Sequence, residues 1–470
     1  MKSMNKYRYL VKNIGLLTLS GFATKLLSFF LVPLYTSVLT TADYGTYDLF
    51  NTTIGVLLPI LTLNIQEGVL RYAMEANSDR KAIVSIGCKY LINSSAIVAL
   101  GLGVNWILDI NNLMRDYGIF FFLMFFTQAL SGIVSFYIRG IDRISDLSVS
   151  SVIASVVTIG LNILFLAFFK WGLIGYFVAN IIGPLIQDIY LIYRGQILKD
   201  VNLGKAYDIE TKQLLNYSRP LIANSIAWWV NNASDRYIII FFCGLASNGI
   251  YSVASKIPSI LNVFQTIFNQ AWALSAVKDY DPNDTSGFFS NTYKVYNCLM
   301  TIICSGIIVM DKILARILYV KEFYIAWRYV PWLTIAILFG ALSGYIGGFF
   351  TAVKDSKLFA LSTVIGAITN IILNLIFIPI FGALGAAVAT SISYFEVFLM
   401  RLVQSKKYIK LQIDLVRDII SYALIVIQAV MLLVFSKTSL LDGMGCVLFL
   451  LICFLYLKDI KKAIKKLLNR

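Results

Sequence analysis

Uninterrupted apolar runs of about 20 residues recur along the whole chain, and they constrain its fold more than any other feature. A run of this kind has to lie in lipid or in a protein core. In lipid, its backbone groups can be satisfied only within a helix or a closed β-barrel. Barrel strands alternate apolar and polar residues, whereas these runs are continuous. The sequence therefore predicts an all-α integral membrane protein.

The composition supports this prediction, because 59% of the 470 residues are hydrophobic and only 14% are charged. Soluble domains are about a quarter charged. We count about fourteen spans, and the linkers between them are too short for a soluble domain. Their centres fall near residues 25, 58, 95, 128, 159, 183, 229, 260, 301, 340, 368, 392, 427 and 449.

Lysine and arginine in the linkers predict the orientation, since the inner loops of membrane proteins carry an excess of both. With the N-terminus inside, about 30 basic residues fall on the inner side and about 7 on the outer side. This predicts cytoplasmic N- and C-termini, and no cleavable signal pattern precedes the first run. The net charge of +15 is scattered over many short loops, so we expect no nucleic-acid partner.

Two segments of the chain stand apart from this simple orientation pattern. The 311–327 linker should lie outside, yet it holds three basic residues. Either this segment is amphipathic and lies at the membrane interface, or the number of spans counted in this region is wrong. The basic tail from residue 458 is amphipathic, and we expect it to rest on anionic lipid of the inner leaflet.

The two halves of the chain resemble each other in sequence. Matching segments occur in the same order: 44–48 with 248–252, 172–180 with 382–390, and Asn162 with Asn374. We therefore predict a six-helix lobe in residues 1–207, a second in 208–410, and helices 13 and 14 with the tail in 411–470. Six spans are an even number, so both copies insert the same way up, and parallel repeats place the substrate site between them.

Polar side chains follow the apolar runs between residues 216 and 270 at steps of three and four, which places each set on one helix face. Asp235, Arg236 and Lys256 lie in these runs, and a charge near the bilayer centre costs roughly 2.5–3.5 kcal/mol. We therefore predict a shared, water-accessible interior. Its expected polar lining is Asn224, Trp228, Asn232, Ser259 and Asn262, although Trp228 would also suit lipid contact.

The order of several loose motifs, together with two six-span halves and two extra spans, resembles a known superfamily. The motifs are residues 21–33, 43–47, 68–72, 235–236, 249–256 and 374–385. They resemble the multidrug/oligosaccharidyl-lipid/polysaccharide exporters, and within these the O-antigen and capsule polysaccharide flippases. The resemblance implies a V-shaped, two-lobed fold with alternating access. It also implies that the chain moves a polyprenyl-pyrophosphate-linked oligosaccharide to the outer leaflet of a bacterial plasma membrane.

A pyrophosphate headgroup would be attracted by cations in a partly desolvated cavity. Lys25 is the first candidate, because it lies about 11 residues, or about 16 Å, from the inner end of its span. Snorkelling would recover only part of that depth. Arg236 and Lys256 lie nearer the outer end of their spans, so either a ligand role or snorkelling suits them.

Four further charged residues are candidates for gating or coupling. Glu67 and Arg71, near the inner end of the second span, would close an inner gate or form a pair at the helix end. Asp235 would be a structural counter-ion or act on the substrate. Glu396 would take up a coupling ion, H⁺ or Na⁺, or pair with Arg401 or another inner-side cation. Transport would be coupled to this ion gradient or to the membrane potential.

Other functions fit the sequence less well. A lipid II flippase of the same superfamily is barely separable, whereas a drug/cation antiporter would need buried carboxylates where the first span offers Lys25. A membrane glycan polymerase or ligase would need a larger loop with clustered acids, and the acidic stretch 279–284 reads as a solvated turn. The chain lacks histidine, which excludes His-based catalysis, and it lacks a phosphate-binding loop, so we expect no intrinsic ATP hydrolysis. Its six cysteines have no metal-ligand spacing, and we expect no enzymatic activity, cofactor or metal.

Overall fold

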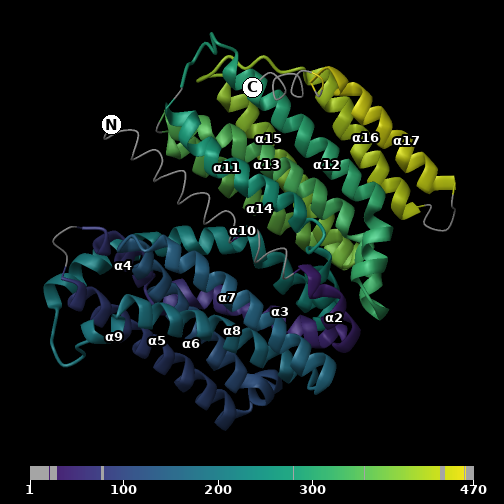
Figure 1. Cartoon of the computed structure of the whole chain (residues 1–470). Coiled ribbons are helices and arrows are strands. Elements are labelled where there is room, and N and C mark those ends of the chain that lie inside the picture. Colours follow the sequence, from purple (N-terminus) through teal and green to yellow (C-terminus); the bar gives the residue numbers. More distant parts are fainter. Residues whose placement is uncertain are drawn as a thin grey trace. The chain divides into compact units, whose positions relative to one another are not determined.

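The computed structural model describes residues 21, 29–75, 79–278, 280–353, 355–434, 440–459 and 461. These residues form helices and their connections, without a single strand in the described part (Figure 1). The predicted all-α class is confirmed.

Several of the described helices are long and apolar enough to cross a membrane. There are ten of them in the described ranges, or eleven if the bent pair α3 (Thr41–Leu61) and α4 (Ile65–Ala73) is one span. A multi-pass membrane protein is thereby confirmed. The predicted first span is centred in the part that is not described, so the count of fourteen stays a prediction.

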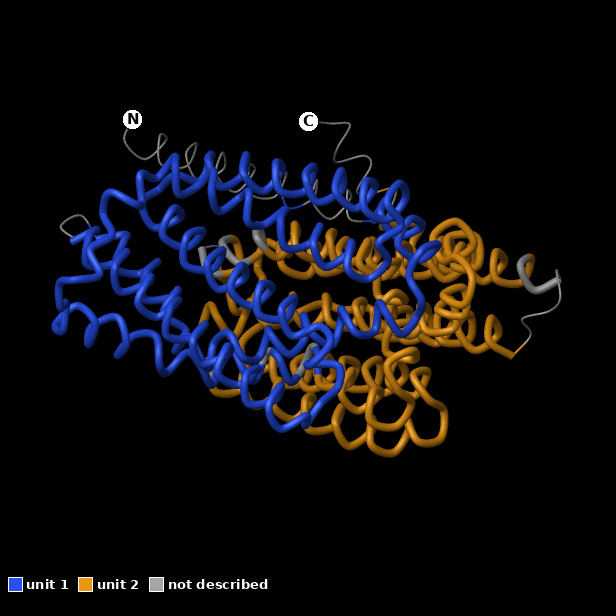
Figure 2. The backbone as a smooth tube through the Cα atoms, turned by 90° about the horizontal axis from the view of Figure 1, so that it is seen from below, with its two compact units in different colours: residues 1–233 blue, residues 234–470 orange. Residues whose placement is uncertain are grey.

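The chain divides into two compact units, Met1–Ala233 and Ser234–Arg470, which Figure 2 shows in two colours. The division falls inside the longest helix, α10 (Asp208–Ala254). The lobe limits drawn from the sequence stay predictions.

Unit 1 is a helical bundle in which α6 (Asn112–Gly140) and α8 (Gly172–Gly195) are central. Helix α6 packs against α3, α4, α5, α7 and α8, and α8 packs against α7. Its core includes Phe50, Phe125 and Phe177, which are fully buried. The remaining elements are α2 (Val32–Val38), α5 (Arg80–Leu108), α7 (Ile144–Asn162), the π-helix η1 (Ile163–Phe168) and α9 (Ile197–Asp200).

Unit 2 is built around α13 (Val330–Ala352), the most buried of its spans. It packs against α11 (Ser259–Lys278), α12 (Phe288–Leu318) and α15 (Ala383–Ser405). Helix α15 also packs against α14 (Ser356–Phe381). The other elements are the 3₁₀ helix η2 (Lys321–Arg328), α16 (Leu415–Val434) and α17 (Leu440–Leu455).

Each copy of the repeated motif begins four residues after a break in the helix. In unit 1 the break is at Thr40, which has extended backbone and caps α3. In unit 2 it is at Gly244, whose φ of 80° and ψ of 174° interrupt α10. The second pair of matching segments also begins alike, because Gly172 and Gly382 both have positive φ at the start of α8 and α15. The two copies therefore share local structure at these points.

The linkers of unit 2 use acidic side chains as helix caps. Asp284 is buried and accepts hydrogen bonds from the backbone N–H groups of Phe289 and Ser290, so this part of the 279–284 stretch caps α12. Asp355 caps α14 and accepts a hydrogen bond from the Tyr408 hydroxyl. These bonds, the Tyr408 bond first, hold the pKa of Asp355 below its usual value.

Two details of the span prediction are wrong. The apolar run from 250 to 270 is not one helix, because α10 ends at Ala254 and α11 begins at Ser259 after a turn that contains Pro258. Proline has no N–H for the helix ladder, which favours a break there. The stripe through this run is therefore split between two helices. Residues 311–318 are likewise no loop, since they form the end of α12.

Candidate functional site

A buried polar network in unit 2 begins at Asp235 on α10. The Tyr251 hydroxyl, beyond the Gly244 break, donates a hydrogen bond to the Asp235 carboxylate. The backbone N–H of Arg236 donates to the other carboxylate oxygen at 2.9 Å. Asp235 is 8% exposed and Tyr251 4%. The break in α10 thus places a tyrosine against a carboxylate that lies 16 residues earlier.

The network continues through neutral oxygens on α14 and α15. Thr390 of α15 lies beside Tyr251, and its hydroxyl donates to the Ala386 carbonyl at 2.9 Å. Asn370 donates to Thr390 Oγ1 at 3.3 Å, and Asn374 donates to Asn370 Oδ1 at 3.0 Å. The Asn374 side-chain oxygen is buried and has no hydrogen-bond partner in the described part of the chain. One carboxylate and several neutral oxygens are a set that suits a small cation or a proton.

The two predicted cations of unit 2 occupy different settings. Arg236 is half-buried on α10 directly after Asp235. Lys256 is half-buried in the turn between α10 and α11, where its carbonyl accepts a hydrogen bond from the Ser259 hydroxyl at 2.6 Å. The spacing predicted that Lys256 would lie in the middle of a helix, but it lies in a turn. The third predicted cation, Lys25, lies outside the described residues.

The predicted lining residues do not form one continuous stripe in the part of the chain that the structure describes. Asn224 and Asn262 are exposed, and Ser259 is half-buried at the start of α11. The side chains of Trp228 and Asn232 lie outside the described part. The neighbouring Trp229 packs on Gly55 and donates its indole N–H to the Thr52 carbonyl at 2.8 Å. These contacts connect α10 to α3. The lining role of the five residues stays a prediction.

Glu67 and Arg71 lie on α4, which is bent by 62° from α3. Arg71 pairs with Glu75 at 3.1 Å, one turn further along the helix. Both side chains are about half exposed, so this pair contributes little stability. At the bend, the Asn64 amide donates to the Ser225 hydroxyl of α10 at 3.3 Å.

Arg401 does not pair with Glu396, although it was one of the partners expected for that glutamate. The Arg401 guanidinium is 5% exposed and donates to Ser362 Oγ, the Ser343 carbonyl and Thr363 Oγ1 at 2.8–3.0 Å. It also lies 4.1 Å from the ring centre of Phe359. One Glu396 oxygen is buried without a hydrogen-bond partner among the described residues.

Sequence reasoning missed an aromatic cluster in unit 1. Tyr35, Tyr44, Tyr47 and Tyr176, from α2, α3 and α8, have ring centres 4.6–6.2 Å apart. Two of these tyrosines belong to the 44–48 motif, which the sequence marked only as a repeat. Asp48, the last residue of that motif, is also buried. Three of the four tyrosines, Tyr35, Tyr44 and Tyr176, are also buried, so the cluster packs α2, α3 and α8 together.

Comparison with known proteins adds a family and a fold. Residues 10–274, more than half of the chain, match the polysaccharide biosynthesis protein family. The probable low-salt glycan biosynthesis flippase Agl15 of Haloferax volcanii is 29% identical over 188 residues, which are 39% of each chain. The chain is thus aligned with well under half of this relative's length.

Solved structures share the fold at low sequence identity. The lipid II flippase MurJ in an inward closed conformation superposes with a TM-score of 0.71 and 15% identity, covering 96% of this chain and 99% of its own. An inward-facing multidrug resistance MATE family transporter of the MOP superfamily gives 0.62 and 13%, covering 82% and 95%. The predicted resemblance is confirmed, and the chain belongs to the polysaccharide biosynthesis protein family.

Proposed function

We propose that this protein is a flippase that moves a polyprenyl-pyrophosphate-linked oligosaccharide from the inner to the outer leaflet. The observation that carries the proposal is the family match over residues 10–274 in a chain with the flippase and transporter fold. The curated relative is named as a glycan biosynthesis flippase, which supports the same class of substrate. Transport by alternating access needs no bond to be broken, so we propose no catalytic step.

The headgroup would be attracted by Lys25, Arg236 and Lys256. The pyrophosphate is anionic, and its attraction to these side chains grows as water is excluded. Asn224, Trp228, Asn232, Ser259 and Asn262 would supply further polar contacts. Glu67 and Arg71 would act at the inner gate.

Coupling would reside in the Asp235 network of unit 2. A carboxylate that is 8% exposed gains from a proton or a bound cation, since burial penalises its charged form. Tyr251, Thr390 and the two asparagines of α14 would complete the oxygen set for H⁺ or Na⁺. Glu396, with its buried oxygen, is the second coupling candidate.

The chain would lie in a bacterial plasma membrane with both termini in the cytoplasm, as its basic linkers indicate. The proposed lobes are residues 1–207 and 208–410, followed by two helices and a tail in 411–470. Its partners would be the lipid-linked oligosaccharide, membrane lipids and the coupling ion.

Reconstitution into liposomes tests this function. The assay follows loss of a labelled polyprenyl-pyrophosphate oligosaccharide from the inner leaflet, beside lipid II and a cationic drug. We expect the oligosaccharide to move in protein-containing vesicles and not in empty ones. If only lipid II moved, lipid II and not the oligosaccharide would be the substrate. Transport of the drug alone would contradict the proposal.

A further inference from the structure

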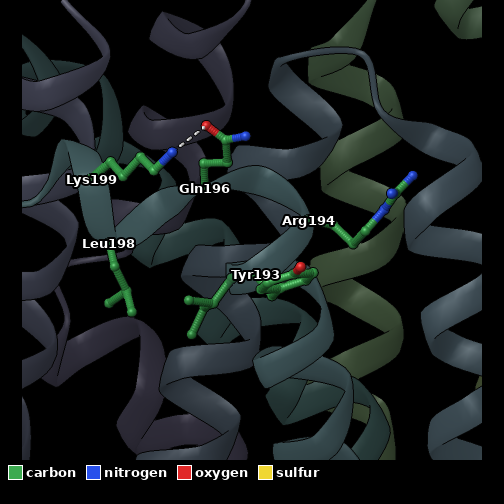
Figure 3. A pocket seen from close by; sticks show the side chains of 6 residues that line it. Tyr193, Arg194, Gln196, Leu198 and Lys199 are labelled. Atoms are coloured by element: carbon green, nitrogen blue, oxygen red, sulfur yellow. Dashed lines mark hydrogen bonds between the residues drawn. The ribbon is translucent and has the colours of Figure 1, made fainter.

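Two adjoining hollows lie at the corner of unit 1 where α8 turns into α9. Their volumes are about 450 and 410 Å³, and they share Gln196 and Lys199. The first is lined by Ile192, Tyr193, Arg194, Gln196, Leu198 and Lys199, most of which Figure 3 labels. The second also includes Arg80, from the start of α5, and Arg143, from the turn between α6 and α7. Three helices and the turn between α6 and α7 therefore converge on one small surface depression.

The backbone of this corner is fixed by packing. Gln196 has a left-handed conformation, with φ of 52°, which turns the chain sharply between the two helices. A Cβ atom at Gly195 would lie 2.6 Å from the Ile138 side chain of α6, so the corner is pressed against that helix. Ile197 is 5% exposed, and the following Asn202 N–H donates to Ser85 Oγ at 2.8 Å. The hollows are therefore preformed.

Positive charge dominates the corner. Asp146 holds two arginines at once, Arg143 at 2.7 Å and Arg194 at 3.1 Å. Arg80 and Lys199 are exposed, and Lys199 Nζ lies 3.3 Å from Gln196 Oε1 (Figure 3). The residues that line the two hollows include four basic side chains, Arg80, Arg143, Arg194 and Lys199, and one acid, Asp200, so the lining carries an excess of positive charge. An anion with several oxygens fits such a cluster.

Apolar side chains adjoin the same cations. Tyr193 is 81% exposed and Leu198 is 74% exposed. In Figure 3, Leu198 points away from the polar ends of Gln196 and Lys199. A free phosphate ion would use only the cations. A molecule with a phosphate and an acyl chain would use both halves of the depression.

We propose that the α8–α9 corner binds an anionic phospholipid of the inner leaflet. Its phosphate would lie among Arg80, Arg143 and Lys199, and an acyl chain would run along Tyr193 and Leu198. The proposal rests on the orientation argued above, with the basic linkers inside, but not on the identity of the transported lipid. The bound phospholipid would be a resident of the protein surface rather than its cargo.

Native mass spectrometry of the purified full-length protein tests the proposal. Phosphatidylglycerol and phosphatidylcholine are titrated against wild type and the double variant Arg80→Gln/Lys199→Gln, in which both altered side chains are exposed. A basic group near an anionic lipid contributes about 1 kcal/mol, or about fivefold. We therefore expect roughly thirtyfold weaker binding of phosphatidylglycerol to the variant, and weak binding of phosphatidylcholine to both proteins.

The matched control is Arg115→Gln/Lys170→Gln, which removes the same charge near the opposite ends of α6 and α8. It should bind phosphatidylglycerol as wild type does. Equal losses in both double variants, or equal binding of the two phospholipids, would overturn the proposal. The proposal would also be overturned if glycerol phosphate, which has no acyl chains, bound as tightly as phosphatidylglycerol. It would be overturned as well if a polyprenyl pyrophosphate displaced phosphatidylglycerol at equal concentration. Flipping is measured in a separate assay. If the transport assay fails, the phospholipid affinities from mass spectrometry can therefore still be interpreted.

Discussion

Replacing Gly244 by alanine measures what the backbone conformation at the break of α10 costs a residue other than glycine in free energy of unfolding. The φ of 80° and ψ of 174° at this residue lie in a region that is essentially restricted to glycine. No heavy atom lies within 4 Å of the position that a Cβ atom would take. Steric clash therefore adds nothing, and the cost is the backbone strain of about 1–3 kcal/mol.

Gly101→Ala is the matched control. Gly101 lies in α5 with helical geometry, and its Cβ position also has no neighbour within 4 Å. Alanine in a helix interior is more stable than glycine by roughly 0.5–1 kcal/mol. The same added methyl group should thus destabilise the protein at residue 244 and stabilise it at residue 101.

Thermal unfolding of the two variants in the same detergent measures the difference. We expect the midpoint to fall for Gly244→Ala and to rise for Gly101→Ala. The first variant should also weaken the Asp235 network, because the break positions Tyr251. Equal upward shifts in both variants would show that residue 244 is helical, and the reasoning about the break would then be refuted.

Two other perturbations test the polar interior of unit 2. Arg417, 13% exposed, bridges Asp418 and Asp459, so Arg417→Met should cost about 3–5 kcal/mol in unfolding experiments, whereas the exposed Arg115→Met should cost at most about 1 kcal/mol. A loss below 1 kcal/mol at Arg417 would show that its carboxylates are hydrated. Asp235→Asn should leave substrate binding in place and abolish the dependence of flipping on an H⁺ or Na⁺ gradient. Full ion dependence in that variant would remove Asp235 from coupling.

The class of fold could be predicted because lipid leaves so few choices. Continuous apolar runs cannot cross a membrane except as helices, and the chain has many of them. The breaks could not be predicted in the same way. Gly244 and Gly249 look alike in an apolar run, since small residues also serve close helix packing. Only the structure shows that the first interrupts α10 and the second does not.

The candidate site was predicted in part for a related reason. The sequence singles out Asp235 as a buried charge, but its contact with Tyr251 depends on the break between them. Arg401 is satisfied by hydroxyl and carbonyl oxygens of α13 and α14, not by the nearby Glu396. Neutral partners of this kind leave no charge pattern in the sequence.

The most direct test of the account is the flipping rate of a polyprenyl-pyrophosphate oligosaccharide at a fixed membrane potential, for wild type and Lys25→Ala. One charge crossing the membrane contributes about 2.3 kcal/mol per 100 mV. We predict that wild type flips the lipid, more slowly once the potential is collapsed, and that Lys25→Ala is strongly impaired. Flipping that ignores both the potential and ion gradients, and that survives the loss of Lys25, would contradict a cation-guided flippase.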